Sequence, residues 1–259
     1  MSTKPRVVIV GGHVRSGTTM LGKVMNTHPD IVMMHEFRGF GRLNRPWWRH
    51  LKGIKHSSLV PLPLDDRRKK FGELGTWWFI ARYAVFLLPH FPKIRYADAR
   101  RALQLCYPKA RLVGDQAAQN HSQMLPLSKQ KDCRVVIIHR DCRDVVQSTV
   151  RRLRSDWAEK PRMGRWDVAT IATRWVRMMD RLEQADERIM KVRYEEFVAD
   201  PAPTIERLGE FLQVDPAGFR TDFVRKDSVG LHRSVLSEGE MATVMEIAGP
   251  TLKRMGYVQ

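Results

Sequence analysis

Short apolar runs recur along the chain, separated by longer stretches in which apolar residues return with helical spacing. The runs cover residues 6–10, 31–34, 110–114, 134–139 and 189–194, and 110–114 is the weakest of them. Residues 135–138 read Val-Val-Ile-Ile, a continuous run typical of a strand buried on both faces of a parallel sheet. The pattern therefore predicts five strands, of which 134–139 is the most deeply buried.

Four stretches between or after these runs have the spacing of amphipathic helices. They cover residues 18–26, a helix that Asp141 caps and that continues to about 153, residues 167–186, and residues 202–212 with Pro203 in the first turn. Strands that alternate with helices favour one α/β layout. We therefore expect a single domain over residues 1–259, built as a three-layer sandwich around a central, mostly parallel sheet.

Residues 37–109 interrupt this alternation. The region contains the pairs Trp47-Trp48 and Trp77-Trp78, several prolines and the basic cluster 67–70. We interpret it as a helical, Trp-rich insertion that shapes an acceptor-binding site, because tryptophan can stack on a sugar face or cover a lipid chain. The alternative is that these tryptophans form the core of a helical cap.

The charge balance favours an anionic partner. Lys and Arg number 45 against 28 Asp and Glu, which gives a formal net charge of +17. A solvated basic surface is the simpler alternative. With a strand expected from residue 6 we expect no signal peptide, and the longest apolar run, 77–89, is too short to span a bilayer. Three scattered cysteines indicate reduced thiols, so we expect a cytoplasmic protein, with room for peripheral membrane contact.

The segment 11-GGHVRSGTTM-20 follows the first predicted strand and begins a helix. It has the spacing G-x-x-x-x-G, and the N–H groups at such a helix start point at a bound anion. Thr18 stands where a P-loop NTPase has its lysine, while Arg15 can supply the missing charge with forked donors. The strand 134–139 ends in His139-Arg140 without a Walker B aspartate, and we expect no metal because cations and amides already hold the leaving group. An ordinary glycine turn is the alternative.

A second anion site is predicted after the strand 134–139. Arg140 follows the strand at the edge where open α/β sheets bind ligands. Ser148 lies eight residues further on, about two helical turns, and so can point back to that edge. Taken alone, a solvated arginine and a serine bonded within its own helix explain this pair equally well. Two such sites on one edge suggest a nucleotide with phosphates at both ends.

These segments resemble the sulfotransferases that use 3′-phosphoadenosine 5′-phosphosulfate (PAPS). The loop 15-RSGTT-19 resembles the family's 5′-phosphosulfate loop, and 140-RDCRDVVQS-148 resembles its 3′-phosphate motif. Residues 193–212 are similar to the family's late strand and helix. The resemblance implies a P-loop NTPase-like sulfotransferase fold, PAPS as donor and 3′-phosphoadenosine 5′-phosphate (PAP) as product, without a metal. The donor-binding residues that it implies in these two motifs are Arg15, Ser16, Gly17, Thr18, Thr19, Arg140 and Ser148.

A further segment, 223-FVRKDSVGLHR-233, resembles the loop that closes over the nucleotide in this family. The resemblance implies that Arg225 and Lys226 bind donor phosphate. Asp227 departs from the family pattern, which has glycine at this point. Gln116 is a second departure, since several members have lysine there. These departures put the contribution of both segments in question.

Glu36 is the predicted general base, because it follows the second short strand and should emerge on the same edge as the phosphate loop. Glycan and tyrosylprotein sulfotransferases share R-S-G-T-T, a helix, H-P-D and then a glutamate base. The interval from Arg15 to Glu36 is similar to that of the tyrosylprotein type, which also implies that Arg38 binds the acceptor and that Arg15 assists catalysis. A surface carboxylate paired with Arg38 is the alternative.

Three other side chains could act as the base: His35, Asp115 and His121. His121 is the best of them because the cytosolic members use a histidine near the end of the third strand. Its polar surroundings in the sequence nevertheless predict an exposed, inert side chain. The acceptor itself is expected to be a hydroxyl, less favourably an amine, on a small molecule, glycan or lipid.

Two other functions fit parts of the sequence. A P-loop kinase fits the glycine loop but lacks the lysine and the Walker B aspartate. A non-catalytic basic protein that binds nucleic acid or another anionic surface fits the charge of +17. No nucleic-acid module is recognisable, so we expect no specific nucleic-acid partner. The oligomeric state is left open by the sequence.

Overall fold

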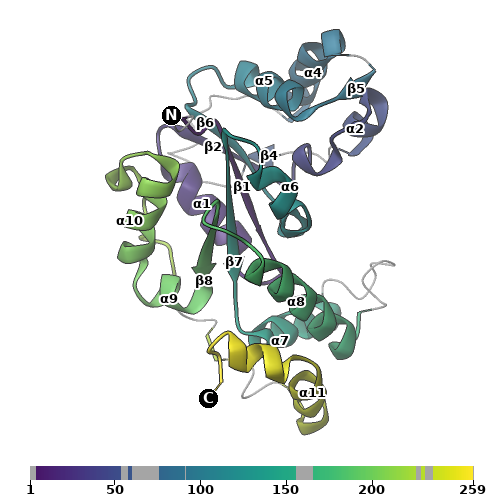
Figure 1. The fold of residues 1–259 in the computed structure, drawn as a ribbon, viewed down its shortest axis with the longest axis vertical. Helices are drawn as coiled ribbons and strands as arrows, with labels where there is room; N and C mark the ends of the chain where they lie inside the picture. Colours follow the sequence, from purple (N-terminus) through teal and green to yellow (C-terminus); the bar gives the residue numbers. More distant parts are fainter. Residues whose placement is uncertain are drawn as a thin grey trace.

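The computed structural model describes residues 4–53, 58–59, 76–90, 92–155, 166–225, 229–230 and 236–258. Its centre is a six-stranded sheet in the order β4-β2-β6-β1-β7-β8, in which all strands except β4 are parallel (Figure 1). The strands are β1 (Val7–Gly12), β2 (Ile31–His35), β4 (Ser58–Leu59), β6 (Leu112–Gln116), β7 (Cys133–His139) and β8 (Ile189–Arg193). The predicted fold class is confirmed.

Helices cover both faces of the sheet, and alternate residues of each strand face the two layers. Val8 and Val10 of β1 pack towards α1 (Thr18–Thr27), α9 (Tyr194–Ala199) and α10 (Pro201–Leu212). Val7 and Ile9 pack on the opposite side. That layer includes α5 (Tyr96–Cys106), α6 (Met124–Ser128), α7 (Cys142–Leu153), α8 (Val168–Glu183) and α11 (Glu238–Arg254). No helix in the described ranges has the length and apolar content needed to cross a bilayer.

The predicted strands are found, but one of them lies two residues further along the sequence than expected. Residues 110–114 were expected as a strand, but β6 begins at Leu112 and continues to Gln116. Ala110 still belongs to a turn, since its N–H donates to Tyr107. At the other end Asp115 and Gln116 are buried and pair with β1 and β2, although their polarity suggested that the strand had ended.

The predicted helices are also found, and their caps explain their limits. The carboxylates of Asp141, Asp167 and Asp200 each accept a backbone N–H in the first turn of α7, α8 and α10. Outside 37–109, three further α-helices of the described ranges were not predicted: α6, α9 and α11. The short α9 follows directly on β8, and α11 begins at Ser237 with a capping box that includes Glu240.

The described part of the 37–109 region consists mainly of helices. These are α2 (Trp47–Gly53), α4 (Thr76–Leu87) and α5, with a two-stranded ribbon of β3 (Arg45–Pro46) and β5 (Lys93–Ile94). Its core is formed by rings of Phe37, Phe79 and Tyr83 in edge and stacked contacts. Trp48 and Trp78 are 49% and 73% exposed, so these two do not form a cap core. The basic cluster 67–70 lies outside the described residues.

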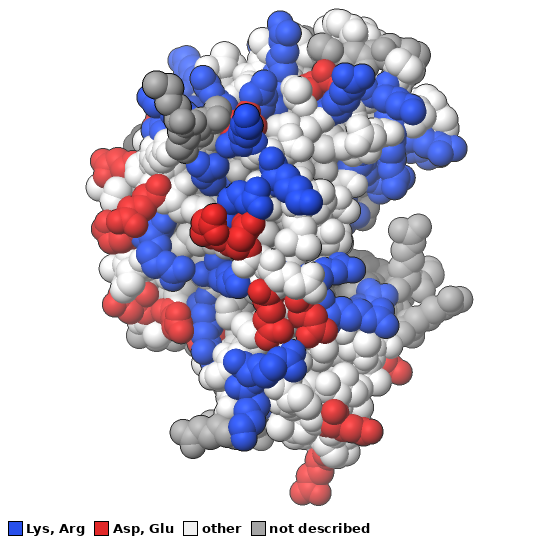
Figure 2. Space-filling model, viewed as in Figure 1, with Lys and Arg blue, Asp and Glu red and all other residues white. Residues whose placement is uncertain are grey.

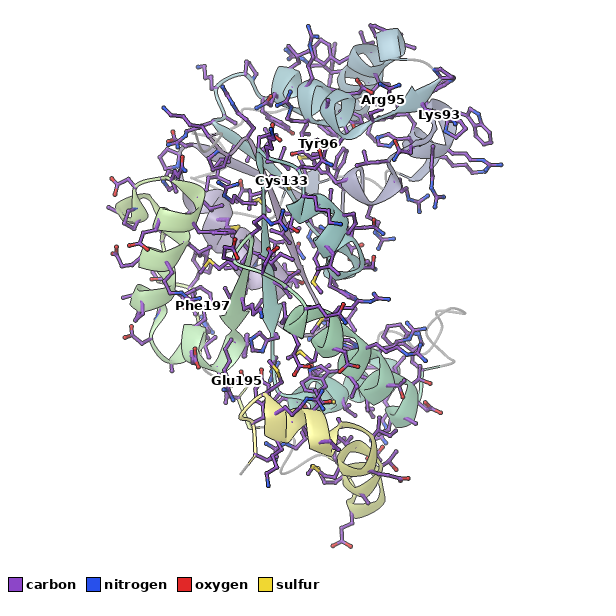
Figure 3. All side chains as sticks on the ribbon, in the orientation of Figure 1. Lys93, Arg95, Tyr96, Cys133, Glu195 and Phe197 are labelled. Atoms are coloured by element: carbon purple, nitrogen blue, oxygen red, sulfur yellow. The ribbon has the colours of Figure 1, made fainter. Side chains whose placement is uncertain are left out.

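The direction of the sheet determines where a ligand can bind. Figure 3 shows Cys133, at the start of β7, near the upper end of the sheet and Glu195, just after β8, near its lower end. The carboxyl ends of the parallel strands therefore point downwards in these views. Open α/β sheets bind ligands beyond the carboxyl ends of their strands. The predicted site residues follow β1, β2 and β7 and so lie at this edge.

Candidate functional site

The loop between β1 and α1 forms a tight turn at the carboxyl edge. Arg15 has a left-handed backbone with φ 68°, and Gly17 has φ 93°. A Cβ on Gly17 would lie 2.6 Å from the ring of Tyr194, so a larger residue would have to displace this ring. The Ser16 N–H closes the turn by donating to the carbonyl of His13 at 3.1 Å. The chain is thereby brought directly into α1 at Thr18.

The start of α1 is suited to an anion. No side chain caps this N-terminus, and its first turn carries no acidic residue. Its N–H groups and the positive end of the helix dipole are therefore directed at the loop. The hydroxyl of Ser16 is buried and makes no hydrogen bond within the described part of the chain. A buried hydroxyl of this kind is costly unless a ligand engages it.

The second predicted site touches the first. Arg15 donates from Nε to the hydroxyl of Ser148 at 2.9 Å, and Arg140 donates from Nη1 to the carbonyl of Arg15 at 3.3 Å. The backward direction predicted for Ser148 is therefore observed. The two predicted phosphate sites are not separate in this structure, because Arg15 bridges them.

This cluster is strongly positive. Burial, followed by the nearby charges of Arg152 and Arg140, lowers the pKa of Arg15. Asp144 forms an ion pair with Arg140 at 3.3 Å, and the guanidinium of Arg140 lies 4.6 Å from the ring centre of Tyr194. Guanidinium groups held this close repel one another, so an anion between them would be stabilised.

Asp144 and Tyr194 also belong to this site, although neither was predicted there. The spacing of Arg140 and Asp144 in the sequence, four residues apart, could have indicated the ion pair. Asp144 also accepts the N–H of Gly230 at 2.8 Å. This bond holds Gly230, in the segment 223–233 that we call the late loop, beside α7. Arg225 is exposed, and the predicted phosphate ligand Lys226 lies outside the described residues, as do Asp227 and Ser228.

Glu36 lies just beyond β2 in an unusual backbone conformation. Its φ is 50° and that of Arg38 is 58°, a region that residues with a side chain rarely adopt. Asp115 fixes this turn by accepting the N–H groups of Phe37 and Arg38 at 2.9 and 3.0 Å. Asn120 in turn donates to Asp115. Nothing in the sequence indicated that Asn120 supports this turn.

The carboxylate of Glu36 is paired but accessible. Arg38 donates from Nη2 to Oε2 at 3.0 Å, and the Glu36 side chain is 40% exposed. The Nε of Arg38 is buried without a hydrogen-bond partner among the described residues. The pair that the sequence left as the alternative is therefore present, and the Arg38 side chain is 21% exposed beside it.

Two of the alternative bases have structural roles. Asp115 is fully buried, and burial raises its pKa to about 6 despite the N–H groups that it accepts. His35 shares a hydrogen bond of 2.7 Å between its Nδ1 and Oε1 of Gln116. Gln116, at the position where relatives have lysine, is buried at the end of β6. Asp115 and His35 are therefore both already engaged within the protein.

His121 differs from the expectation of an exposed, inert side chain. It is half-buried, and its Nδ1 lies 3.1 Å from the carbonyl of Gly12 and 2.8 Å from that of Ala118. Carbonyl oxygens only accept, so Nδ1 carries the proton and Nε2 has a free lone pair. Burial, assisted by the charge of Arg181, lowers the pKa of His121. The imidazole is therefore held neutral against the phosphate loop.

A cavity of about 380 Å³ opens beside this histidine. It is lined by His13 and Val14 of the loop and by one face of α8, together with Ala118, Gln119, His121 and Trp166. Figure 2 shows the molecular surface hollowed on the right, between the helices at the top of the view and α8, with Lys and Arg on both flanks. The charge of +17 predicted such a basic surface but not its place.

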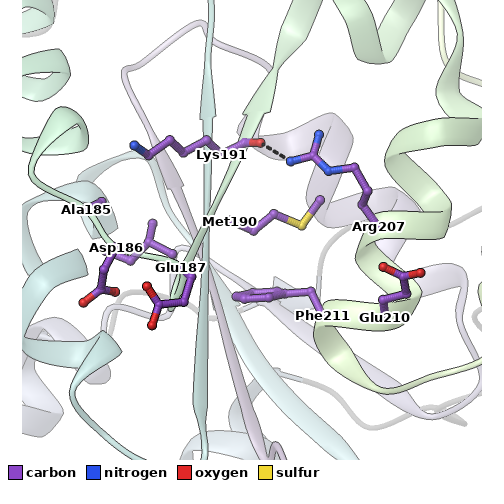
Figure 4. Close-up of a pocket in the computed structure, with 9 residues that line it drawn as sticks. Ala185, Asp186, Glu187, Met190, Lys191, Arg207, Glu210 and Phe211 are labelled. Carbon is purple, nitrogen blue, oxygen red and sulfur yellow. Dashed lines mark hydrogen bonds between the residues drawn. The ribbon is translucent and has the colours of Figure 1, made fainter.

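A larger cavity of about 620 Å³ lies elsewhere (Figure 4). It is formed where β8 begins, by Met190 and Lys191 with Arg207 and Phe211 of α10. Arg207 donates there to the carbonyl of Lys191 at 3.3 Å. This is the amino end of an edge strand, away from the phosphate loop. Size alone does not make it the site, since ligands of open α/β sheets bind at the carboxyl ends.

Comparison with known proteins relates both the sequence and the fold of this chain to sulfotransferases. Residues 109–217 match the model of a family described as the sulfotransferase family. This range contains Arg140 and Ser148, whereas Arg15 and Glu36 precede it. No curated protein matches the chain by sequence.

Solved sulfotransferases share the fold over almost the whole chain. The sulfotransferase domain of the Synechococcus PCC 7002 olefin synthase is 16% identical, with a TM-score of 0.63, and the alignment covers 96% of this chain and 95% of that domain. For a sulfotransferase from Alicyclobacillus acidocaldarius the values are 17%, 0.53, 97% and 94%. For mouse sulfotransferase SULT7A1 complexed with PAP they are 14%, 0.50, 98% and 86%. The predicted resemblance to the sulfotransferase family is thereby confirmed.

Proposed function

We propose that this sulfotransferase-like protein transfers the sulfuryl group of PAPS to a hydroxyl of a small molecule, glycan or lipid, with Glu36 as general base. An amine is the less favoured acceptor. Family and fold support sulfuryl transfer in general. The proposal adds the donor, the acceptor group and the residues. We also propose a cytoplasmic setting, for which the reduced state expected of the cysteines is the reason.

The observation that carries the donor is the contact between Arg15, Ser148 and Arg140 at an uncapped helix N-terminus. PAPS has anionic groups at both ends of a nucleoside, so a positive cluster fed by two motifs suits it. Arg15, Ser16, Gly17, Thr18 and Thr19 would hold the 5′-phosphosulfate. Arg140 and Ser148, with Arg225 and Lys226 from the late loop, would hold the 3′-phosphate.

The residues of this chain fit such a donor. Ser16 offers a buried hydroxyl without a partner in the described ranges, and Arg15 sits among like charges that a phosphate would neutralise. For this to happen Arg15 must release Ser148 or share it with the donor. The exchange is favourable, because the hydrogen bond from the Arg15 guanidinium to a neutral hydroxyl would be replaced by a charge-assisted bond to phosphate, which is roughly twice as strong.

The proposed reaction is an in-line displacement at sulfur. The acceptor oxygen forms a bond to sulfur while the bond from sulfur to the 5′-phosphate oxygen breaks, and PAP departs with the electron pair. The acceptor proton passes to Glu36. Charge that develops on the departing phosphate is stabilised by Arg15 and the N–H groups at the start of α1.

Glu36 is supported by its backbone as well as by the resemblance. Arg15, Glu36 and Arg38 are three of the five described residues other than glycine that have positive φ. Such conformations cost of order 1–3 kcal/mol each and gather at functional sites. The Glu36 carboxylate and the Arg38 guanidinium, with side chains 40% and 21% exposed, form a pair that can meet an acceptor hydroxyl. Arg38 would then orient the acceptor.

His121 is the alternative base, and a specific contact favours it. Its Nδ1 proton is held by the carbonyl of Gly12, which leaves Nε2 free beside the loop. Glu36, by contrast, lies beyond β2, two strands away from β1 in the sheet, or about 10 Å at the usual strand spacing. Sheet twist and the length of the acceptor decide which of the two reaches the reacting oxygen.

The test is transfer from ³⁵S-labelled PAPS to a fractionated extract, followed by identification of the labelled product. With that acceptor, Glu36→Gln should reduce kcat by about 10²–10⁴ while PAP affinity stays within about twofold. His121→Asn serves as the matched variant and should retain most of the activity. Loss of turnover in His121→Asn but not in Glu36→Gln would assign the base to His121. No labelled product from any fraction would count against sulfuryl transfer.

A further inference from the structure

The cavity beside the phosphate loop has a basic wall that the proposed donor site does not use. Arg174, Arg177 and Arg181 all line it from α8. Their spacing of three and four residues places them on one face of the helix, over about 10 Å of its length. All three are exposed, whereas Met178, which also lines the cavity, is buried.

The negative charges of α8 are directed elsewhere. Asp180 and Glu183 both pair with Arg254 of α11, at 3.1 and 3.3 Å. Within the described part of the chain, no ion pair involves Arg174, Arg177 or Arg181. Arg177 and Arg181 are also four residues apart, where like charges destabilise a helix slightly. Among the described residues, no carboxylate therefore neutralises the arginine face.

The cavity adjoins the phosphate loop and His121, the alternative base. His13 and His121 also line it, and the Nδ1 of His121 is bonded to the loop carbonyl of Gly12. Arg174 stacks over Trp166, with its guanidinium carbon 4.3 Å from the ring centre. Stacking holds a guanidinium flat and leaves its edge free to donate to an anion. A group bound here would lie next to the donor loop.

None of the described residues that line this cavity comes from 37–109. The insertion was expected to shape the acceptor site, and that expectation stays a prediction. The cavity indicates a different contributor, since α8 belongs to the central α/β core.

We propose that this cavity binds the acceptor, and that Arg174, Arg177 and Arg181 select an acceptor carrying a carboxylate, sulfate or phosphate group in addition to its hydroxyl. The inference rests on the proposed transfer from PAPS. A volume of about 380 Å³ suits one ring or one sugar unit. Forked guanidinium donors match the planar or tetrahedral oxygens of these anions. The anionic group would lie on α8 and the hydroxyl would point to the loop.

The test uses calorimetric titration of the full chain saturated with PAP, so that the donor sites cannot capture the probe. The probes are 4-hydroxybenzoate and its uncharged methyl ester, which differ only in charge and one methyl group. At low ionic strength the anion should bind about tenfold more tightly, since the arginines are partly exposed. In Arg177→Met/Arg181→Met the preference should fall to within about twofold.

Arg101→Met is the matched control, because it removes an exposed arginine from α5, which does not line the cavity. It should keep the preference for the anion. Equal binding of both probes, no binding of 4-hydroxybenzoate, or an unchanged preference in the double variant would each overturn the proposal. The PAP titration that precedes these measurements tests the donor separately.

If PAP does not bind, the proposed donor is wrong, and the same probes are titrated into the nucleotide-free chain. A difference between wild type and the double variant, absent in Arg101→Met, would then still support an anion site on α8. No difference would overturn it.

Discussion

Arg15 is held in a left-handed conformation between the guanidinium groups of Arg140 and Arg152. Clustered like charges destabilise a fold and are typical of sites that bind an oppositely charged ligand. The hydroxyl of Ser148 satisfies one donor of Arg15 in the meantime. Arg15 therefore combines a strained backbone with repulsion from neighbouring arginines. Both destabilise the folded loop, and a bound phosphate would relieve the repulsion.

This balance makes a prediction for Arg15→Met. PAP affinity should fall by about ten- to a hundredfold, because a charge-assisted bond to phosphate is lost. The free energy of unfolding should not fall, since repulsion from Arg140 and Arg152 is relieved at the same time. Calorimetry with PAP and urea unfolding measure the two effects.

Arg101→Met provides the control for a lost positive charge far from the loop. It should leave PAP affinity within about twofold of wild type. If Arg15→Met destabilised the protein while binding PAP normally, the arginine would be a structural residue and not a phosphate ligand.

For single residues, the sequence predicted the candidate functional side chains but not the residues that hold them in place. Arg15, Glu36 and Arg38 were predicted from motif and spacing, and their strained backbones are an independent sign of function. Asp115 and Asn120, which fix the Glu36 turn, were not recognised in that role. Their contacts join residues 78 and 5 positions apart, and the first depends on β2 and β6 being neighbours in the sheet. A local pattern does not encode that neighbourhood.

Helix α8 supports the end of β7 through one buried hydrogen bond. The indole Nε1 of Trp175 donates to the carbonyl of Arg140 at 2.8 Å, and the ring is fully buried. The carbonyl lies where the strand has ended and no ladder partner remains. The position of Arg140 therefore depends on a residue of a different element, 35 positions later.

We predict that Trp175→Phe lowers the free energy of unfolding by at least about 1–3 kcal/mol, because a buried carbonyl loses its donor. PAP should also bind more weakly as Arg140 loses its support. Trp78→Phe is the matched variant, since Trp78 is 73% exposed, and should change stability by less than about 0.5 kcal/mol. Equal stability of the two variants in urea would contradict this role of α8.

The elements were predicted where pattern and capping agreed. The caps Asp141 and Asp167 mark the starts of α7 and α8, and the Val-Val-Ile-Ile run forms β7. The strand β6 was misplaced by two residues because polar Asp115 and Gln116 are buried by their strand partners. For α11 the signal was present, as Ser237 and Glu240 form a capping box, but the helix was not predicted.

The molecule as a whole carries buried histidines that are neutral when folded. Burial lowers the pKa of His13 and of His139 to about 4, from an ordinary value of 6.5. Between these values the unfolded chain binds more protons than the folded one. The contribution of these two histidines to the free energy of unfolding is therefore fully present above about pH 6.5 and is lost as the pH falls towards 4. Asp115 opposes this trend, because its pKa is raised by burial and it gains a proton in the folded state first.

Replacing His139 should remove its share of the acid sensitivity. The Nδ1 of His139 lies 2.7 Å from the hydroxyl of Tyr257, and Asn can maintain that contact. From pH 7.5 to pH 5.0 wild type should lose roughly 2 kcal/mol relative to His139→Asn. Urea unfolding at both pH values measures the difference. A difference that is the same at both would show that His139 does not titrate on unfolding.

At this largest scale the fold class and the ligand edge were predicted, but the placement of charge was not. The alternation of strands and helices determines which residues reach the carboxyl edge, and this places the loop, Arg140 and Glu36 together. The arginine face of α8 was interpreted only as part of a long amphipathic helix. Its role depends on the cavity that it lines, to which Ala118, Gln119 and His121 also contribute from a distant part of the chain.

The central claim is that the loop and the Arg140 site hold a nucleotide with phosphates at both ends. Calorimetric titration of the purified chain with PAP and with ATP, each with and without Mg²⁺, tests it most directly. We predict that PAP binds at least about tenfold more tightly than ATP and that Mg²⁺ leaves its affinity unchanged. ATP binding that exceeds PAP binding and requires Mg²⁺ would contradict the claim and indicate a P-loop kinase or NTPase.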